Sequence, residues 1–282
     1  MKLCMTLLIR DEESIIEANI DYHLSRGVDF ILVMDNLSTD KTTEILKRYE
    51  SKGVLKYIFQ PDDDYSQDLW VTQMANMAIN KYSADWVIHV DADEFWWPQN
   101  ELSFKTVLGN IPSQYDGITV QRNNFFYPAS ISEDTLFFNR MIHRQVHSTN
   151  ILGKPLPPKV GHRSKAHIQI NQGNHSFMIK GQPPQVLDSN DLTILHFPVR
   201  SKKDFIHRIQ QGGDAYNRNT RFSKEIGETW RKLHDALGKS EFEEYFSSVS
   251  ISDQVAKQMI AEGDVVEDIR FREYMLNLYS CK

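Results

Sequence analysis

The stretch from Trp86 to Trp97 constrains the fold of this chain more than any other part, and it reads W-V-I-H-V-D-A-D-E-F-W-W. Its first five residues are rich in aromatic and β-branched side chains, which predicts a short buried strand. Asp91, Asp93 and Glu94 follow directly. If the chain stays extended, Asp91 and Asp93 project to one side, where two carboxylates repel each other unless a cation lies between them. Oxygen ligands suit a hard ion, so the stretch predicts a site for Mn²⁺ or Mg²⁺; the alternative is a solvated acidic turn after a core strand.

Length and charge narrow the class of protein. A chain of 282 residues can form one large domain or a domain with an appendage. Its net charge of −6 argues against a general nucleic-acid binder. Cys4 and Cys281 lie at opposite ends, so we expect neither a disulfide framework nor a zinc site. No apolar run approaches the ~18 residues of a membrane span. We therefore expect a cytoplasmic protein, with peripheral membrane contact left open.

Strands and helices alternate through the first hundred residues. We expect strands at residues 3–9, 30–34, 55–59 and 86–90, with a helix in each interval between them. This alternation predicts a parallel sheet flanked by helices, in which ligands bind beyond the carboxyl ends of the strands. No glycine-rich phosphate-binding fingerprint occurs, so a nucleotide would be held by a metal and by side chains. The loops expected at this edge of the sheet comprise residues 10–12, 35–40, 62–67 and 91–94.

Three motifs in this region together resemble the family 2 glycosyltransferases of the GT-A fold. They are I-R-D-E-E after the first strand, M-D-N-L-S-T-D-K-T after the second, and D-W-V-I-H-V-D-A-D-E-F at the fourth. The resemblance covers the first hundred residues well and the remainder loosely. It implies a GT-A-like fold, a nucleotide-sugar donor that is usually a UDP-sugar, and a divalent metal. Asp91 and Asp93 would hold the metal or the ribose. The residues expected at the donor are Arg10, Asp11, Glu12, Asp35, Gln67 and Asp91.

The same resemblance leads to a division of the chain and to a reaction. We expect a GT-A-like domain over residues 1–200, with a nucleotide-binding half at 1–97 and an acceptor half at 98–200. A helical extension without strands would follow at 201–282. The enzyme would move a sugar, with inversion, to a hydroxyl group of a glycan, lipid-linked or protein acceptor in glycan or polysaccharide biosynthesis. The alternatives are a non-catalytic nucleotide-sugar or carbohydrate-binding protein and a nucleotidyltransferase.

The catalytic base has three candidates. Ser132-Glu133-Asp134 resembles the acidic triplet from which family 2 enzymes often take their base, which makes Asp134 the first candidate. An ordinary helix start with acidic residues in its first turn is the competing interpretation. Asp188 and Asp191 are the alternatives for the base.

Basic residues are concentrated in the second half of the expected domain. Residues 135–187 contain no Asp or Glu although the chain is acidic overall. We expect this segment to face the acidic loop, with Lys159 and Arg163 beside the donor diphosphate and Lys165 near them. Gly153–Pro158 and Asn171–Asn174 are rich in turn-forming residues. By resemblance, His196 is a candidate third contact to the metal or diphosphate, and a buried core histidine is the alternative.

Overall fold

A computed structural model describes residues 1–100, 102–129, 136–150 and 152–281. The described chain forms two compact units. The first comprises residues 1–62, 66–122 and 157–195, and the second comprises residues 63–65, 123–156 and 196–282. The expected division at residues 97 and 200 stays a prediction. The first unit contains segments from both sides of residue 97, and the second contains segments from both sides of residue 200.

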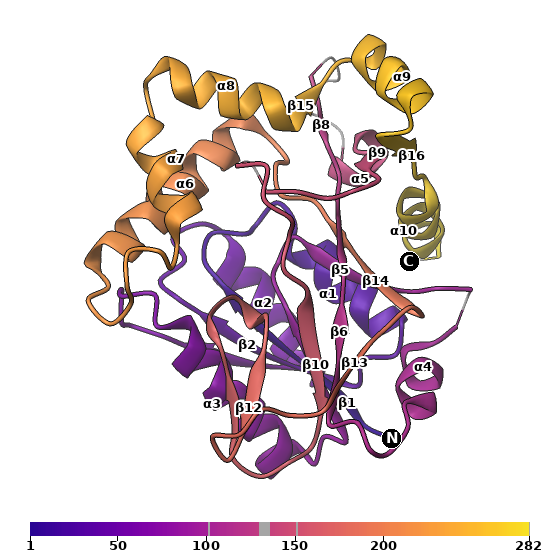
Figure 1. The fold of residues 1–282 in the computed structure, drawn as a ribbon. Helices are drawn as coiled ribbons and strands as arrows, with labels where there is room; N and C mark the ends of the chain where they lie inside the picture. Colours follow the sequence, from indigo (N-terminus) through magenta and orange to yellow (C-terminus); the bar gives the residue numbers. More distant parts are fainter. Residues whose placement is uncertain (101, 130–135, 151, 282) are drawn as a thin grey trace. The chain divides into compact units, whose positions relative to one another are not determined.

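A seven-stranded sheet forms the centre of the first unit (Figure 1). Its strand order is β13-β6-β10-β4-β1-β2-β3, and β10 alone runs antiparallel to its neighbours. The expected α/β class, a mostly parallel sheet flanked by helices, is confirmed. The strands are β1 (Leu3–Ile9), β2 (Phe30–Asp35), β3 (Leu55–Phe59), β4 (Trp86–Val90), β6 (Gly117–Val120), β10 (Lys159–Arg163) and β13 (Val186–Asp188).

Helices and small strand pairs complete the first unit. Strand β14 lies beside β5 in a separate small sheet, and β11 pairs with β12 in a hairpin. The helices are α1 (Ile16–Ser25), α2 (Thr42–Ser51), α3 (Gln67–Tyr82), α4 (Phe104–Asn110) and the short 3₁₀ helix η1 (Gln172–Asn174). The remaining strands are β5 (Glu94–Pro98), β11 (Ile168–Ile170), β12 (Phe177–Ile179) and β14 (Leu192–His196).

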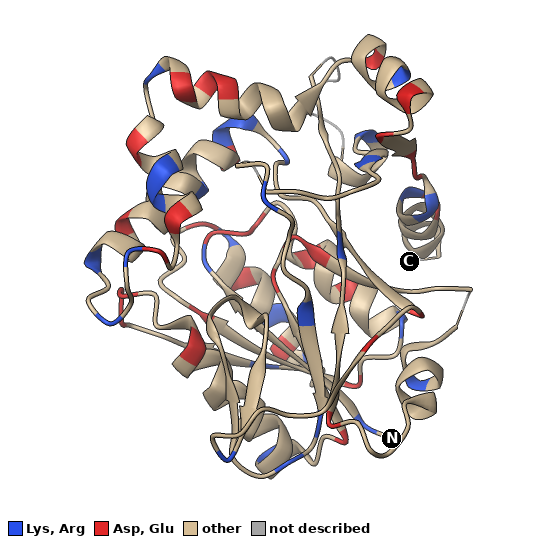
Figure 2. Ribbon diagram, in the orientation of Figure 1, with Lys and Arg blue, Asp and Glu red and all other residues tan. Residues whose placement is uncertain are grey.

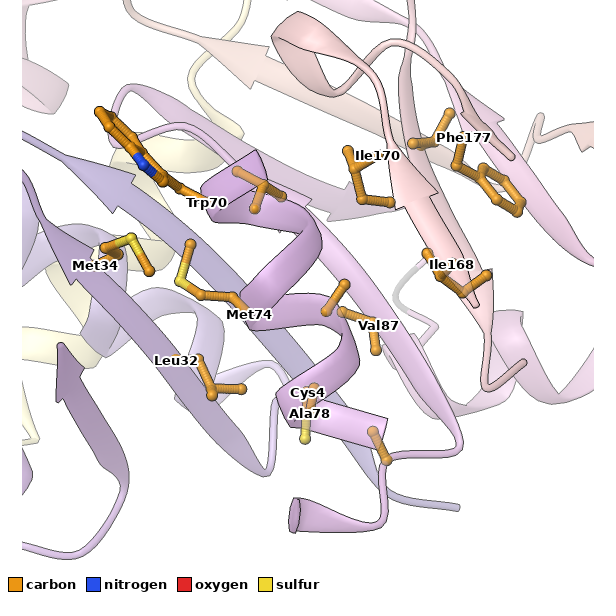
Figure 3. Close-up of a cluster of buried hydrophobic side chains, with 14 residues drawn as sticks. Cys4, Leu32, Met34, Trp70, Met74, Ala78, Val87, Ile168, Ile170 and Phe177 are labelled. Carbon is orange, nitrogen blue, oxygen red and sulfur yellow. The ribbon is translucent and has the colours of Figure 1, made fainter. Parts of the chain in front are cut away.

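Helix α3 packs between one face of the sheet and the β11-β12 hairpin (Figure 3). It buries Trp70 and Met74, whereas Leu69 is 52% exposed. Cys4 is fully buried in the same cluster as a free thiol, as expected of a small core residue. The long apolar face of α3 therefore anchors both the sheet and the hairpin that follows β10.

The carboxyl ends of the parallel strands meet at one edge of the sheet. Ile9 at the end of β1 pairs with Asp35 at the end of β2, and β4 ends beside β1. Because β10 runs in the opposite direction, it begins at this edge, where Lys159 pairs with Val120 at the end of β6. The antiparallel strand thus brings a basic residue to the edge at which the parallel strands end in polar loops.

The second unit contains most of the C-terminal part of the chain. Strand β15 pairs with β8 and β16 with β9, so the expectation that no strand follows residue 201 is wrong. In both pairs a short strand finds hydrogen-bond partners for its backbone in a distant segment of the chain. The elements are β7 (Arg122–Asn124), β8 (Tyr127–Pro128), α5 (Phe137–Arg140), β9 (His143–Gln145), α6 (Lys202–Arg218), α7 (Glu228–Ala236), α8 (Ser240–Val249), β15 (Ser250–Ile251), α9 (Asp253–Glu262), β16 (Val265–Glu267) and α10 (Arg270–Ser280). None of the helices that the structure describes is long and apolar enough to cross a membrane.

Helix α6 continues through Gly212 and Gly213, although glycine in a helix interior is ordinarily unfavourable. A Cβ atom at Gly212 would lie 2.7 Å from the ring of Trp230, and one at Gly213 would overlap the Cβ of His234. Both contacts come from α7. The two glycines therefore allow close packing of α7 on α6 and do not stop the helix.

Replacing Gly213 by Ala is expected to lower the free energy of unfolding by about 2 kcal/mol, because the added methyl group overlaps the backbone-proximal Cβ of His234. Thermal and urea unfolding would measure this loss. Gly109→Ala in α4 is the matched control, since a Cβ atom at this position would meet no neighbouring segment within 4 Å. We expect that variant to be neutral or slightly stabilising. Equal losses in both variants would contradict the packing role of Gly213.

Two buried histidines make the stability of the first unit depend on pH. Burial lowers the pKa of both His23 and His162 to about 4. The unfolded chain therefore binds these protons more readily, so the stability contribution is complete above pH 6.5 and falls as the pH drops towards 4. We expect a loss of about 3 kcal/mol per histidine over this interval. The free energy of unfolding, measured with urea between about pH 7 and 4, should depend less steeply on pH in His162→Gln than in the wild type. Its pH dependence should be unchanged in the exposed control His167→Asn. An undiminished slope for His162→Gln would contradict the assignment.

Candidate active site

The acidic turn, defined as Asp91–Glu94, follows β4 at the carboxyl edge of the sheet. The N–H of Glu94 donates to the carbonyl of Asp91 at 3.0 Å, and the N–H of Asp91 donates to Oε2 of Glu94 at 3.4 Å. The chain therefore turns here, and the expectation that it stays extended through Asp93 is wrong. The side chain of Asp91 is 34% exposed, whereas Asp93 is 3% exposed and Glu94 is fully buried. The turn presents carboxylates of different accessibility within four residues.

Lys159 places a buried positive charge against this turn. Only 1% of the residue is exposed, and its ammonium contacts Oδ2 of Asp91. The same nitrogen lies 3.4 Å from Oε1 of Glu94 and donates to the carbonyl of Gly173 at 2.9 Å. A buried ammonium is stable only with such partners. Lys159 is therefore held against the acidic turn, and its contact with the donor diphosphate stays a prediction.

Arg122 is a second cation at the turn, and the sequence did not single it out. It follows β6, and its Nη1 lies 3.4 Å from Oε1 of Glu94. Its Nε and Nη2 donate to the carbonyl of Pro157 at 3.1 and 2.9 Å. Glu94 thus lies between Lys159 and Arg122. In Figure 2 the basic residues of β10 are blue, and no acidic residue interrupts that strand.

The loop that contains η1 also contacts Asp91. Asn174 donates from Nδ2 to Oδ1 of Asp91 at 3.2 Å, and its own Oδ1 is buried without a hydrogen-bond partner among the described residues. Gln67, at the start of α3, accepts from the N–H of Gly173 at 2.9 Å through Oε1. Gly173 has a φ of +77°, a backbone conformation that favours glycine. Gln67, expected at the donor, therefore holds the loop that carries Asn174.

The positive charges at the turn also act on a nearby imidazole. The Nδ1 atom of His175 lies 2.8 Å from the carbonyl of Pro158. The pKa of His175 is lowered to about 4, first by burial and then by the charges of Lys159 and Arg122. His175 is therefore neutral at neutral pH, and its pKa reports on the cations beside it.

Carboxylate and amide oxygens, which hard divalent cations prefer as ligands, occur in the acidic turn and beside it. Asp91 and Asp93 offer carboxylates, and Asn174 offers a buried amide oxygen that has no other partner in the described structure. Mg²⁺ and Mn²⁺ are usually bound by one or two carboxylates, with water and substrate phosphates completing the shell. No group of three His, Cys, Asp or Glu side chains able to hold a metal occurs in residues 1–100, 102–129, 136–150 and 152–281. His196, expected as a third ligand, belongs to the second unit and bonds through Nδ1 to Oδ1 of Asn124 at 2.6 Å.

The residues expected at the donor from the first two loops lie at the same edge, and three of them bond within those loops. Asp35 is 1% exposed and accepts from the N–H of Ser38 at 3.0 Å and the hydroxyl of Thr43 at 2.7 Å. Asp11 accepts from the N–H of Thr39 at 2.6 Å. The N–H of Glu12 donates to the hydroxyl of Thr42 at 2.8 Å, and Arg10 follows β1 directly. The bonds of Asp11 and Glu12 connect the loop after β1 to the loop after β2.

Other expected site residues lie away from the acidic turn. Arg163 ends β10 at the opposite edge of the sheet, where it donates to the carbonyls of Ile111 and Tyr115 and stacks over Trp86. Lys165 follows it and pairs with Asp116. Only the first residue of a strand that runs antiparallel can reach the carboxyl edge, so Arg163 is not brought to the turn.

The candidate bases differ in position. Asp188 lies on the outer strand β13 and accepts from the hydroxyl of Thr119. That strand is three places from β4, or about 14 Å at the usual strand spacing. The carbonyl of Asp191 accepts from the N–H of Gln99 at 2.8 Å. Asp134 lies outside the described residues.

The sequence profile of glycosyltransferase family 92 matches residues 1–246. The chain belongs to glycosyltransferase family 92. The expectation of a glycosyltransferase is thereby confirmed at the family level, although the match names family 92 and not family 2. The part of the chain assigned to family 92 includes the whole acidic turn, Arg122, Lys159 and Asn174.

Solved structures with a similar arrangement include two with UDP bound. TarS 1–349 of S. aureus in complex with UDP is 15% identical, with a TM-score of 0.45 over 84% of this chain and 73% of that chain. Glucosyl-3-phosphoglycerate synthase from Mycobacterium tuberculosis, in complex with Mn²⁺, UDP and glucosyl-3-phosphoglycerate, is 16% identical, with a TM-score of 0.32 over 43% of this chain and 44% of that chain. Both similarities are low, so nothing about the substrate or mechanism of the family 92 chain follows from them. No curated protein sequence matches the chain.

Proposed function

We propose that this family 92 protein transfers a sugar from a UDP-sugar to a hydroxyl acceptor with the help of Mn²⁺ or Mg²⁺. The observation that supports this most strongly is the pairing of the acidic turn with the buried Lys159 at the carboxyl edge of β4. A diphosphate carries negative charge, and in the absence of a glycine-rich loop a bound metal and nearby cations can hold it. The acidic turn, Lys159 and Arg122 supply both kinds of partner.

In the proposed reaction, Asp91 and Asp93 would hold the metal, and Asn174 would offer an additional oxygen. When bound, the metal would supply Lewis-acid stabilisation of the departing diphosphate. Lys159 and Arg122 add positive charge where negative charge develops as the bond from the sugar to the diphosphate breaks. Both cations are fixed by hydrogen bonds before the substrate binds, so they need little reorganisation.

The acceptor hydroxyl would attack the anomeric carbon while a carboxylate takes its proton. A single displacement of this kind inverts the configuration at that carbon. The base remains one of Asp134, Asp188 and Asp191. We extend the proposal to a glycan, lipid-linked or protein acceptor and to glycan or polysaccharide biosynthesis, with a cytoplasmic location.

A donor panel tests the proposal. The protein would be incubated with UDP-, GDP- and dTDP-sugars, with Mn²⁺ or with EDTA, and released nucleoside diphosphate would be measured. We expect slow hydrolysis of one UDP-sugar that requires Mn²⁺ and accelerates with the correct acceptor. Tight calorimetric binding of a donor without turnover on any acceptor would instead support the non-catalytic binding protein. Release of pyrophosphate from a nucleoside triphosphate and a sugar phosphate would support the nucleotidyltransferase.

A further inference from the structure

Asn19 is a fully buried polar residue in the interior of helix α1, a position that ordinarily favours an apolar side chain. Its Nδ2 donates to the carbonyl of Ala92 at 3.0 Å and to the carbonyl of Glu94 at 3.0 Å. Both hydrogens of one amide group are thus used on backbone oxygens of the acidic turn. Ala92 lies between the two aspartates, so this bond fixes the backbone from which both carboxylates project.

His23 orients this amide from the next turn of the helix. Its Nδ1 lies 2.8 Å from the carbonyl of Asn19 and 3.1 Å from the Oδ1 of Asn19, and the N–H of Trp96 donates to its Nε2 at 3.4 Å. Burial lowers the pKa of His23 to about 4, so the ring is neutral. Because Nε2 accepts from Trp96, the proton lies on Nδ1, where the carbonyl and Oδ1 of Asn19 share it. With Oδ1 towards His23, the NH₂ group of Asn19 faces the acidic turn.

Asn19, Tyr22 and His23 form a row on α1 whose side chains make hydrogen bonds to backbone atoms. Tyr22 donates from its hydroxyl to the carbonyl of Trp96 at 2.8 Å. Residues 19, 22 and 23 are spaced as neighbours on one helix face. All three side chains bond to the segment that begins with the acidic turn and continues into β5. Burying these polar groups is favourable only when their hydrogen bonds are complete, so the row specifies one position for that segment.

We infer that Asn19, oriented by His23, is a positioning residue that holds the acidic turn in the geometry needed to bind the metal and the donor. This inference rests on the proposed function of the turn. An apolar residue at position 19 could fill the space, but it would leave the carbonyls of Ala92 and Glu94 without these donors. The turn could then relax, and a shift of about 1 Å at a reacting group costs on the order of 100-fold in rate.

The test compares Asn19→Leu with a matched control, Tyr49→Phe. The control also removes a buried hydrogen bond to α1, from the hydroxyl of Tyr49 to Asp21 at 2.6 Å, and a longer one to Glu17 at 3.5 Å, but it does so at a distance from the turn. We expect both variants to lose thermal stability, whereas only Asn19→Leu lowers kcat, by about 100-fold, and weakens Mn²⁺-dependent UDP binding. Similar kcat values for the two variants, measured well below their unfolding temperatures, would overturn the inference. Asn19→Ser, which keeps one donor, replaces the leucine variant if that does not fold, and an intermediate kcat is then expected.

Hydrogen exchange separates this inference from the proposed function. If the wild-type protein neither binds nor transfers a sugar, the proposed function fails, and the amide of Glu94 still reports on the turn through its bond to Asp91. Faster exchange of that amide in Asn19→Leu than in Tyr49→Phe supports the positioning role. Equal exchange in both variants excludes it.

Discussion

Replacing Asp93 by Asn is expected to lower the kcat of glycosyl transfer about 10³-fold in a protein that remains folded. The substitution keeps the size of the side chain and removes one negative charge from the acidic turn, where the hard cation is proposed to bind. Loss of a Lewis acid removes several kcal/mol of transition-state stabilisation, and each ~1.36 kcal/mol is tenfold in rate. The half-saturating Mn²⁺ concentration should rise together with the loss of turnover.

Asp85→Asn is the control for this experiment. Asp85 precedes the same strand at its other end, and its side chain is 61% exposed. We expect its turnover and Mn²⁺ dependence to match those of the wild type. Wild-type kinetics in Asp93→Asn would show that this carboxylate takes no part in metal binding.

Replacing Lys159 by Met is expected to lower kcat/KM for the donor by about 10²–10³-fold. The ammonium is one of the two fixed cations at the proposed diphosphate site, and methionine retains the length of the side chain without the charge. The free energy of unfolding should also fall by about 3 kcal/mol, because the buried Glu94 loses one of its two cationic partners. Steady-state kinetics and urea unfolding measure the two effects separately.

Lys165→Met provides the comparison, since Lys165 lies beyond the other end of β10 and its side chain is 44% exposed. It should leave both kinetics and stability close to wild type. In Lys159→Met the pKa of His175 should rise towards its ordinary value, because one of the charges that lowers it is gone. If the pKa of His175 rises as expected but kcat/KM for the donor is unchanged, Lys159 does not contact the diphosphate.

The sequence predicted the parallel half of the sheet because each strand there is followed locally by its helix. The strands before β4, and β4 itself, are short apolar runs with turn signals between them, and these signals depend only on neighbouring residues. The carboxyl-edge position of Asp91 followed from that order. The conformation after Val90 did not, because the turn is held by side chains of α1 that lie far earlier in the chain.

The antiparallel insertion of β10 could not be predicted in the same way. Lys159 was expected at the donor only because the segment from 135 to 187 lacks acidic residues, and that signal applied equally to Arg163. The register of β10 distinguishes them, because Lys159 begins the strand at the carboxyl edge and Arg163 ends it at the opposite edge. Arg122 and Asn174 were missed because each reaches the turn by contacts between distant segments.

In the C-terminal part, too, contacts between distant segments set features that the sequence pattern did not predict. The mainly helical character of this part was expected, but α6 runs through two glycines that allow the close packing of α7. The short strands β15 and β16 carry little pattern of their own and exist because β8 and β9 pair with them. Two- and three-residue strands of this kind are set by their partners.

A crystal structure of the protein with Mn²⁺ and UDP tests the central claim most directly. We expect an anomalous manganese peak bound by Asp91 and Asp93, with diphosphate oxygens in the same coordination shell and the ammonium of Lys159 within hydrogen-bonding distance of the diphosphate. A structure with UDP bound elsewhere, and with the acidic turn still occupied only by Lys159 and Asn174, would contradict it.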